Sequence, residues 1–404
     1  MAILVNPTAI CNILTLRYNP EIKPLLPIKT WKDFQPDNAV ISIEHIENTI
    51  SGLLKQKIES NKIKKISIAL SGGIDSTLIL AMSRKLFPDI EIEAITIKFA
   101  KSTDESSVAA KIAENFEANH HIVYLENYLE ELPKAISVVN MPFWDLHWYH
   151  VVKKSQSLSK YLASGDGGDE LFGGYTFRYE KFLSLTTQNS TPQEKVKAYL
   201  QCHERDRVPD QEELFDAKAE FTWDAIYNTL LPYFDNSLPS LEQVFLADYN
   251  GKLLYNFNPV NTRILNHFQV EGINPLLSDN IISSATHISD MQKYDQNKNL
   301  GKLPLRELLK KYNAISFVPD QKLGFNVDTK NLWKSYGKSI CTEYLLDSSI
   351  VNDGWINKKW ITNYINRDDL DIRYINKFLG LLAFEIWYRL FVTRDMNENE
   401  KLQI

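Results

Sequence analysis

The chain has 404 residues, of which 44% are hydrophobic and 24% charged, and its formal net charge is −6. This composition predicts a globular protein whose core needs no disulfide or structural metal. The negative net charge disfavours a nucleic-acid partner, because nucleic-acid binding is driven by positive side chains that release counterions from the phosphates. No apolar run approaches the ~20 residues that cross a bilayer, so we expect a soluble, cytoplasmic protein without membrane partners.

Prolines recur through residues 1–40, at positions 7, 20, 24, 27 and 36. Because proline interrupts regular structure, this segment is predicted to be an extended N-terminal extension that docks on the rest of the chain. Residues 41–60 then place apolar side chains at helical spacing, which predicts an amphipathic helix.

Between residues 41 and 185, short β-rich runs alternate with helical runs. The predicted strands are 64–70, 91–99, 120–125 and 161–163, and the predicted helices between them are 77–86, 105–118, 127–139 and 151–160. This alternation predicts an α/β core in which a parallel sheet has helices on both faces.

From residue 186 to 404 the β signal fades, which predicts a mainly helical lobe packed against the core. The candidate helices of this lobe are 193–204, 210–218, 220–231, 240–256, 304–312, 356–366 and 374–392.

The string SGGIDST at residues 71–77 lies between a predicted strand and a predicted helix. Its glycines permit a tight turn and close approach of the backbone to an anion, and the helix N-terminus supplies unpaired N–H groups. Ser71, Ser76 and Thr77 add hydroxyl donors. An acidic residue in a phosphate loop requires a cation, so Asp75 is a candidate Mg²⁺ ligand.

The string SGDGGDELFGGY at residues 164–175 interleaves glycines with Asp166, Asp169 and Glu170. The like charges repel one another and the glycines add chain entropy, so an ordinary turn does not need this composition. A bound metal or a catalytic base explains it better.

This pair of strings resembles the synthetase domain of the asparagine synthetase family, a group of pyrophosphate-loop, adenylate-forming ligases. PFWD at residues 142–145, Asp104-Glu105 and LLAFEIWYRLF at 381–391 resemble further family segments, so the likeness covers roughly residues 45–392. It implies an adenine-nucleotide α-hydrolase-like fold for residues 41–185, completed by the helical lobe at 186–404.

The resemblance also implies roles for individual residues. Those expected to bind ATP are Leu70, Ser71, Gly72, Gly73, Asp75, Ser76, Ile97 and Gly165. Asp75 and Asp169 are expected to bind Mg²⁺, while Asp166 is expected to act as the base and Lys322 to stabilise adenylation. The residues expected to contact the substrate are Asp145, Glu170 and Glu271. For His147 and His150, ring packing is the favoured interpretation, with substrate binding favoured over metal binding.

Two departures from the family pattern bear on the substrates. Family members that use glutamine begin with a glutaminase domain whose nucleophile is the cysteine after Met1, whereas residue 2 here is alanine and Cys11 is the only cysteine before the first glycine string. We therefore expect the nitrogen to come from ammonia, a substrate amine or a separate glutaminase subunit.

The second departure lies at residues 253–278, where Asn256, Asn258 and Pro259 stand in place of charged family residues. Arg263 could replace one lost charge. This segment leaves two substrate hypotheses open: an ammonia-dependent ligase making asparagine or a close relative, and a specialised ligase or cyclase that uses a substrate amine or a different carboxylate. A third hypothesis is a non-catalytic synthetase-like subunit. Family members often form homodimers, so a homodimer is a further expectation.

Overall fold

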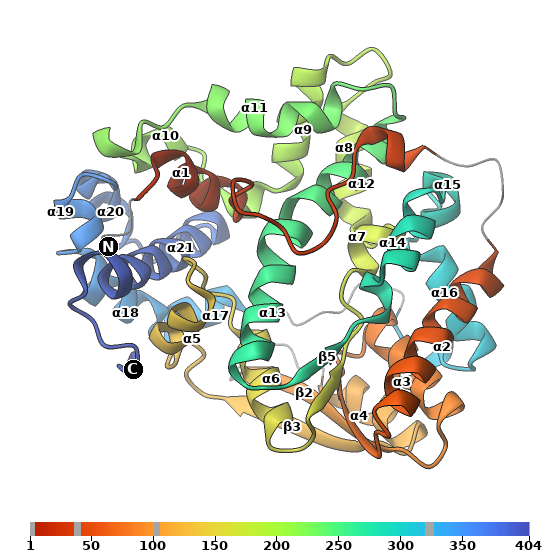
Figure 1. The fold of residues 1–404 in the computed structure, drawn as a ribbon. Coiled ribbons are helices and arrows are strands. Elements are labelled where there is room, and N and C mark those ends of the chain that lie inside the picture. The colour runs from red at the N-terminus through yellow and green to blue at the C-terminus, as the bar shows by residue number, and fades with distance from the viewer. Residues whose placement is uncertain (1–4, 36–41, 100–105, 320–326, 404) are drawn as a thin grey trace.

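The computed structural model describes residues 5–35, 42–99, 106–319 and 327–403. Within these residues, five parallel strands form a sheet in the order β3-β2-β1-β4-β5 (Figure 1). The strands are β1 (Lys65–Ala69), β2 (Glu91–Phe99), β3 (Asn119–Leu125), β4 (Tyr161–Ala163) and β5 (Glu271–Ile273). The predicted parallel α/β core is therefore confirmed.

Helices cover both faces of the sheet, as predicted (Figure 1). On one face lie α2 (Ile43–Ser60), α3 (Ile74–Leu86) and α4 (Ser106–Asn115); on the other lie α5 (Leu132–Val139) and α6 (His147–Gln156). Successive strand residues point to opposite faces. Ile92 and Ala94 therefore join the hydrophobic cluster that includes α3, whereas Ile95 and Ile97 join the cluster that includes α6.

The chain after β4 is mainly helical, as expected from residue 186 onward. Its helices are α7 (Gly168–Phe172), α8 (Thr176–Leu185), α9 (Pro192–Cys202), α10 (Gln211–Leu214), α11 (Trp223–Phe234), α12 (Ser240–Asp248), α13 (Asn258–His267), α14 (Asp279–Thr286), α15 (Asp290–Lys293), α16 (Leu303–Lys311), α17 (Thr329–Leu332), α18 (Lys338–Leu345), α19 (Ser349–Asn352), α20 (Lys358–Tyr364) and α21 (Ile372–Tyr388). None of the described helices is long and apolar enough to cross a membrane. The predicted domain boundaries stay predictions.

One strand was not expected in the helical half. Residues Glu271–Ile273 form β5, which pairs with β4 in register Tyr161 to Glu271. Three residues are too few to show an alternating pattern, so the strand is recognisable only from its partner. Part of the segment expected to bind substrate therefore belongs to the edge of the sheet.

The expectation of an extended N-terminus is wrong for Pro7–Leu16, which form helix α1. Pro7 occupies the first turn, where a missing N–H removes no hydrogen bond. Asn6 caps the helix, because its Oδ1 accepts from the backbone N–H groups of Thr8 at 2.8 Å and Ala9 at 3.3 Å. A proline at this position starts a helix instead of breaking one.

The strand order places a binding crevice between β1 and β4. Chain connections run outward from β1 toward β3 and, on the other side, toward β5, so the order reverses at this pair. In open parallel sheets, ligands bind beyond the carboxyl ends of the strands at such a point. The segments that follow β1 and β4 are the two glycine-rich strings, SGGIDST and SGDGGDELFGGY.

Candidate active site

The first glycine-rich loop joins β1 to the N-terminus of α3. The hydroxyl groups of Ser71 and Ser76 lie 3.2 Å apart, and the N–H of Gly73 donates to Ser71 Oγ at 3.3 Å. Gly72 has φ +75°, a conformation that glycine adopts without strain. Gly73 caps α3 without a side chain, so the first-turn N–H groups face the crevice without a side-chain cap among the described residues. This geometry suits a phosphate group.

The second loop packs directly on the first at Asp75. A Cβ atom on Gly165 would lie 2.5 Å from Cβ of Asp75, and one on Gly168 would lie 2.4 Å from its Cγ. Such distances do not occur between real side chains, so glycine is required at both positions. The structure therefore brings together the two strings that the sequence separates.

A lysine that the sequence did not single out lies between the predicted metal ligands. Lys302 Nζ donates to Asp75 Oδ2 at 2.5 Å and lies 2.7 Å from Asp169 Oδ1. Its side chain is only 8% exposed. Burial alone would lower the pKa of this amine, but Asp169 and Asp75 outweigh it and raise the pKa, so Lys302 remains charged.

The two carboxylates fit a Mg²⁺ ion that is shared with nucleotide phosphates. Mg²⁺ in such sites takes one or two protein carboxylates and completes its shell with phosphate oxygens and water. In the described part of the chain, no cluster of three or more His, Cys, Asp or Glu side chains could hold a metal by itself. Asp75 and Asp169 would supply two such carboxylates, and Lys302 lies between them as a second cation.

Asp166 lies beside this centre in a polar, partly buried niche. Its Oδ2 is 3.0 Å from both Ser164 Oγ and Asn261 Nδ2. Burial raises the pKa of Asp166, and the contacts with Ser164 and Asn261 only partly oppose that effect. A carboxylate with a raised pKa is a better proton acceptor than an exposed one.

Asp145 and His147 form an ion pair near Asp166. His147 Nδ1 lies 2.6 Å from Asp145 Oδ1, and the hydroxyl of Tyr128 donates to the same oxygen at 3.0 Å. Burial would raise the pKa of Asp145, but His147 and then Arg17 hold it at about 2. The charges of Asp145 and Asp166 raise the pKa of His147 despite its burial. These charges therefore form one electrostatic network.

Leu70 and Ile97, which are expected to contact adenine through their backbone, differ in whether their backbone groups already make hydrogen bonds. The N–H of Leu70 donates to the carbonyl of Ile95 at 2.9 Å, and Thr96 Oγ1 donates to the carbonyl of Leu70 at 2.8 Å. Ile97 lies two residues beyond the last β2 residue that pairs with β1, so its backbone on that side is not taken by the ladder. Ile97 is the better placed of the two.

Glu170 and Glu271 are separated in the structure. Glu170 is 5% exposed and accepts from the Tyr175 hydroxyl at 2.6 Å, beside the crevice. Glu271 begins β5 at the opposite end of the sheet, where its exposed carboxylate pairs with Lys160 at 2.8 Å. Glu271 is therefore not brought to the site. Lys322 and Asp104-Glu105 lie outside the described residues.

Comparisons with known proteins agree with this geometry. The family model described as asparagine synthase matches residues 60–389. The glutamine-hydrolyzing asparagine synthetase 1 of Bacillus subtilis is 24% identical over 345 residues, which cover 78% of this chain and 51% of that protein. The glutamine-hydrolyzing asparagine synthetase of Gallus gallus is 24% identical over 207 residues, 39% of this chain and 36% of that protein. The chain thus spans about half or less of these relatives.

Among solved structures, an NH3-dependent NAD synthetase from Campylobacter jejuni is 16% identical. It aligns over 52% of this chain and 93% of that chain with a TM-score of 0.29. A TM-score this low does not support an argument about the fold, which rests on the strand order.

Proposed function

This chain belongs to the asparagine synthase family, and from that premise we propose that it is an ATP-dependent ligase forming a carbon–nitrogen bond. It activates a carboxylate as an acyl-adenylate, releases pyrophosphate and passes the acyl group to ammonia or an amine. One observation carries the proposal: the two glycine-rich loops meet at Asp75, with Lys302 bridging Asp75 and Asp169.

In the first step, a substrate carboxylate oxygen attacks the α-phosphorus of ATP and pyrophosphate leaves. The loop at residues 71–73 and the α3 N-terminus would hold the phosphates, and the buried charge of Lys302 would lie beside them. Mg²⁺ held by Asp75 and Asp169 would neutralise charge on the departing pyrophosphate. Fixed charges at this point stabilise the transition state without rearrangement. Lys322 remains a candidate for the same task.

In the second step, the nitrogen attacks the acyl carbon, AMP leaves, and the nitrogen loses a proton. Asp166 is the proposed acceptor of that proton, because burial raises its pKa and Asn261 and Ser164 fix its orientation. His147 adds a positive charge on the side of Asp145.

Replacing Asp166 with asparagine is expected to slow amide formation about a hundredfold while single-turnover pyrophosphate release stays within about threefold, since general bases contribute on that scale. Quenched-flow assays of both products measure the two steps. Asp368→Asn, which alters a carboxylate that is 96% exposed, serves as the control. An equal loss in both steps would show that Asp166 acts before the nitrogen attacks.

We further propose that this chain does not itself hydrolyse glutamine. The glutaminase of this family uses a cysteine, which attacks as the thiolate, and the three cysteines of the chain, Cys11, Cys202 and Cys341, are all buried. Burial raises the pKa of Cys11 to about 12, and its Sγ donates to the carbonyl of Ala219 at 3.2 Å. These thiols stay protonated at neutral pH. Ammonia would then arrive free or from a separate glutaminase subunit.

With the purified chain, glutamine is expected to give less than about a hundredth of the amide formed with ammonium chloride, because no cysteine provides a thiolate. Product is measured by mass spectrometry after desalting the glutamine stock to remove free ammonia. Equal product from both nitrogen donors contradicts this proposal.

The proposed function as a whole is tested by pyrophosphate release from Mg²⁺-ATP with a panel of carboxylates, each with and without ammonia. Asparagine formed only when aspartate and ammonia are both present supports the simple synthetase. Release with a different acid, or a product that needs a substrate amine, supports the specialised ligase or cyclase, which the uncharged Asn256 and Pro259 favour. Silence with every acid, in a protein that binds ATP, supports the non-catalytic subunit.

A further inference from the structure

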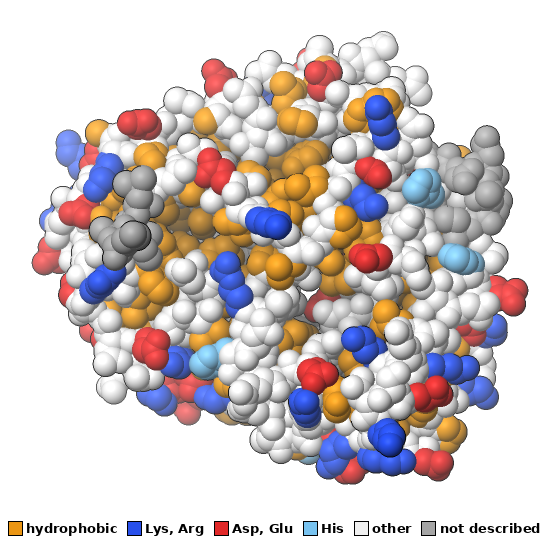
Figure 2. Space-filling view, viewed as in Figure 1, with side chains coloured by type: hydrophobic (Ala, Val, Ile, Leu, Met, Phe, Trp, Pro, Cys, Tyr) orange, Lys and Arg blue, Asp and Glu red, His pale blue; other side chains and the backbone are white. Residues whose placement is uncertain are grey.

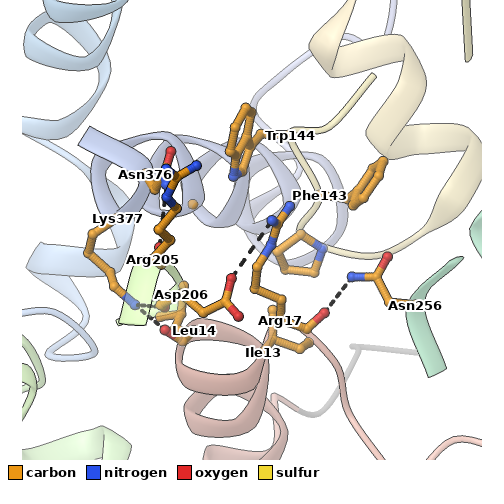
Figure 3. Close-up of a pocket in the computed structure, with 12 residues that line it drawn as sticks. Ile13, Leu14, Arg17, Phe143, Trp144, Arg205, Asp206, Asn256, Asn376 and Lys377 are labelled. Atoms are coloured by element: carbon orange, nitrogen blue, oxygen red, sulfur yellow. Dashed lines mark hydrogen bonds and ion pairs between the residues drawn. The ribbon is translucent and has the colours of Figure 1, made fainter. Parts of the chain in front are cut away.

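Most of the charged side chains that line the hollow between α1 and α21 already contact one another or the backbone. Figure 2 shows this face of the molecule hollowed, with hydrophobic side chains along the hollow. Arg17 lies 3.9 Å from both Asp206 Oδ1 and Asp145 Oδ2. The buried Lys377 Nζ donates to the carbonyls of Leu14 and Asp206 (Figure 3). Through Asp145 this hollow adjoins the candidate active site, so it belongs to the site already described. The β3 edge of the sheet presents a surface that the active site does not use.

Strand β3 forms one edge of the sheet, and its outer side has no strand partner among the described residues (Figure 1). Its inner side pairs with β2 along the whole strand, beginning at Asn119 opposite Glu93. No backbone hydrogen bond joins β3 to any other described segment. In such an edge strand, alternate N–H and C=O groups point outward, where another strand can pair with them.

The sequence of β3 lacks the features that usually protect an edge strand. Natural edge strands avoid pairing with other chains by being short or by carrying charged residues or proline. The opposite edge strand, β5, has only three residues. By contrast, β3 has seven residues, NHHIVYL, and none of them is proline, lysine, arginine or an acid. The length and composition of β3 therefore favour pairing with a further strand.

Two large apolar side chains are exposed on one face of β3. Ile122 is 48% exposed and Tyr124 is 61% exposed. Because they are two residues apart on a strand, both point to the same face of the sheet. The residues that alternate with them, Val123 and Leu125, pack against the hydrophobic core on the other face. A strand added to this edge would cover Ile122 and Tyr124 and would bond the outward backbone groups at the same time.

We propose that the added strand is β3 of a second copy of this chain, paired antiparallel about a two-fold axis through Val123. A two-fold axis uses the same surface on both copies, so the interface closes with two molecules. The two sheets then join into one continuous sheet. The family resemblance leads us to expect a homodimer but indicates no surface for it, and this pairing does not depend on the proposed ligase chemistry.

A register centred on Val123 covers the exposed apolar side chains. It places Tyr124 of each copy opposite Ile122 of the other, and an aromatic side chain opposite a β-branched one stabilises paired strands. It also places Glu126 opposite His120 of the other copy, so no like charges lie directly opposite one another between residues 119 and 127. A single strand pair buries less area than a permanent interface, so the dimer should exchange with the monomer.

Sedimentation velocity of the full chain over about a hundredfold range of protein concentration tests the pairing. The dimer fraction is expected to rise with concentration. Tyr124→Lys is expected to weaken dimerisation at least about tenfold, because lysine on an edge strand opposes pairing. The matched control, Phe177→Lys, makes the same kind of change at a side chain that is 56% exposed on α8, and it should dimerise like the unmodified chain. Circular dichroism checks that both variants are folded.

Val123→Cys tests the register, because in this pairing Val123 lies opposite itself. Facing residues of paired strands have Cβ atoms about 5 Å apart, so mild oxidation should link the two copies through a disulfide. The native cysteines are all buried and should give little background. Leu185→Cys, at a side chain that is 44% exposed on α8, is the control and should not be linked above that background.

A chain that stays monomeric at every concentration would overturn the proposal. Equal dimerisation of Tyr124→Lys and the unmodified chain would also overturn it, because the copies would then meet at another surface. If Tyr124→Lys were monomeric but Val123→Cys gave no linked dimer, the two-fold axis through Val123 would be refuted. None of these measurements needs ATP or a carboxylate, so a failure of the ligase proposal leaves them unaffected.

Discussion

Asp75→Asn is expected to lower pyrophosphate release at least about a thousandfold, which corresponds to ~4 kcal/mol of transition-state stabilisation. Asp75 is the point where the two glycine-rich loops touch, and Gly165 and Gly168 leave room only for a side chain of this size. Asparagine keeps that size, so the loops stay packed. It removes a negative charge that would bind Mg²⁺ beside the phosphates, and amide oxygens are much weaker ligands for that ion.

Single-turnover pyrophosphate release with the best acid of the panel measures this effect, together with ATP affinity at several Mg²⁺ concentrations. The unmodified protein should bind ATP more tightly as Mg²⁺ rises, and Asp75→Asn should lose that dependence. Asp89→Asn, an exposed carboxylate just after α3, is the control for charge alone. Asp89→Asn should release pyrophosphate as fast as the unmodified protein. Normal turnover in Asp75→Asn would contradict the proposal that Asp75 binds Mg²⁺.

Much of the site could be predicted from the sequence because its signals are local. Strand, glycine turn and helix N-terminus follow one another within residues 65–77, and each part restricts the next. The same holds for residues 161–172. The strand order then places both loops at the reversal point of a parallel sheet, where alternating strands and helices already predict a binding crevice.

Other parts could not be predicted because their signals are not local. Lys302 lies at the start of α16, far along the chain from Asp75 and Asp169, and a lysine in a polar stretch is ordinarily a solvated residue. Strand β5 exists only through its pairing with β4. The prolines concealed the helical pattern of α1. The position of Arg17 over the Trp144 ring joins residues far apart in the sequence. Each of these features depends on a contact between distant segments.

Replacing Lys302 is expected to lower both stability and activity, because this residue combines a structural and a catalytic role. It separates two carboxylates whose side chains are only 17% and 22% exposed, Asp75 and Asp169. Removing the cation from such a group leaves like charges facing each other with little water between them, which costs about 3–5 kcal/mol in buried pairs. Bound Mg²⁺ would supply a replacement charge, so the destabilisation should be smaller when the ion is present.

Lys302→Met is therefore expected to lower the free energy of unfolding by about 3 kcal/mol in EDTA. The decrease in the free energy of unfolding should be smaller when Mg²⁺-ATP is present. The variant should also slow pyrophosphate release about a hundredfold. Urea unfolding in both conditions measures stability. The control variant Lys298→Met removes a lysine that is 75% exposed, and it should change the free energy of unfolding by less than about 0.5 kcal/mol.

The double variant Asp75→Asn/Lys302→Met should be more stable in EDTA than Lys302→Met alone, because one of the two opposed negative charges is gone. It should nevertheless remain inactive. If the double variant were the less stable, the two side chains would contribute independently, and Lys302 would not act by holding the carboxylates together.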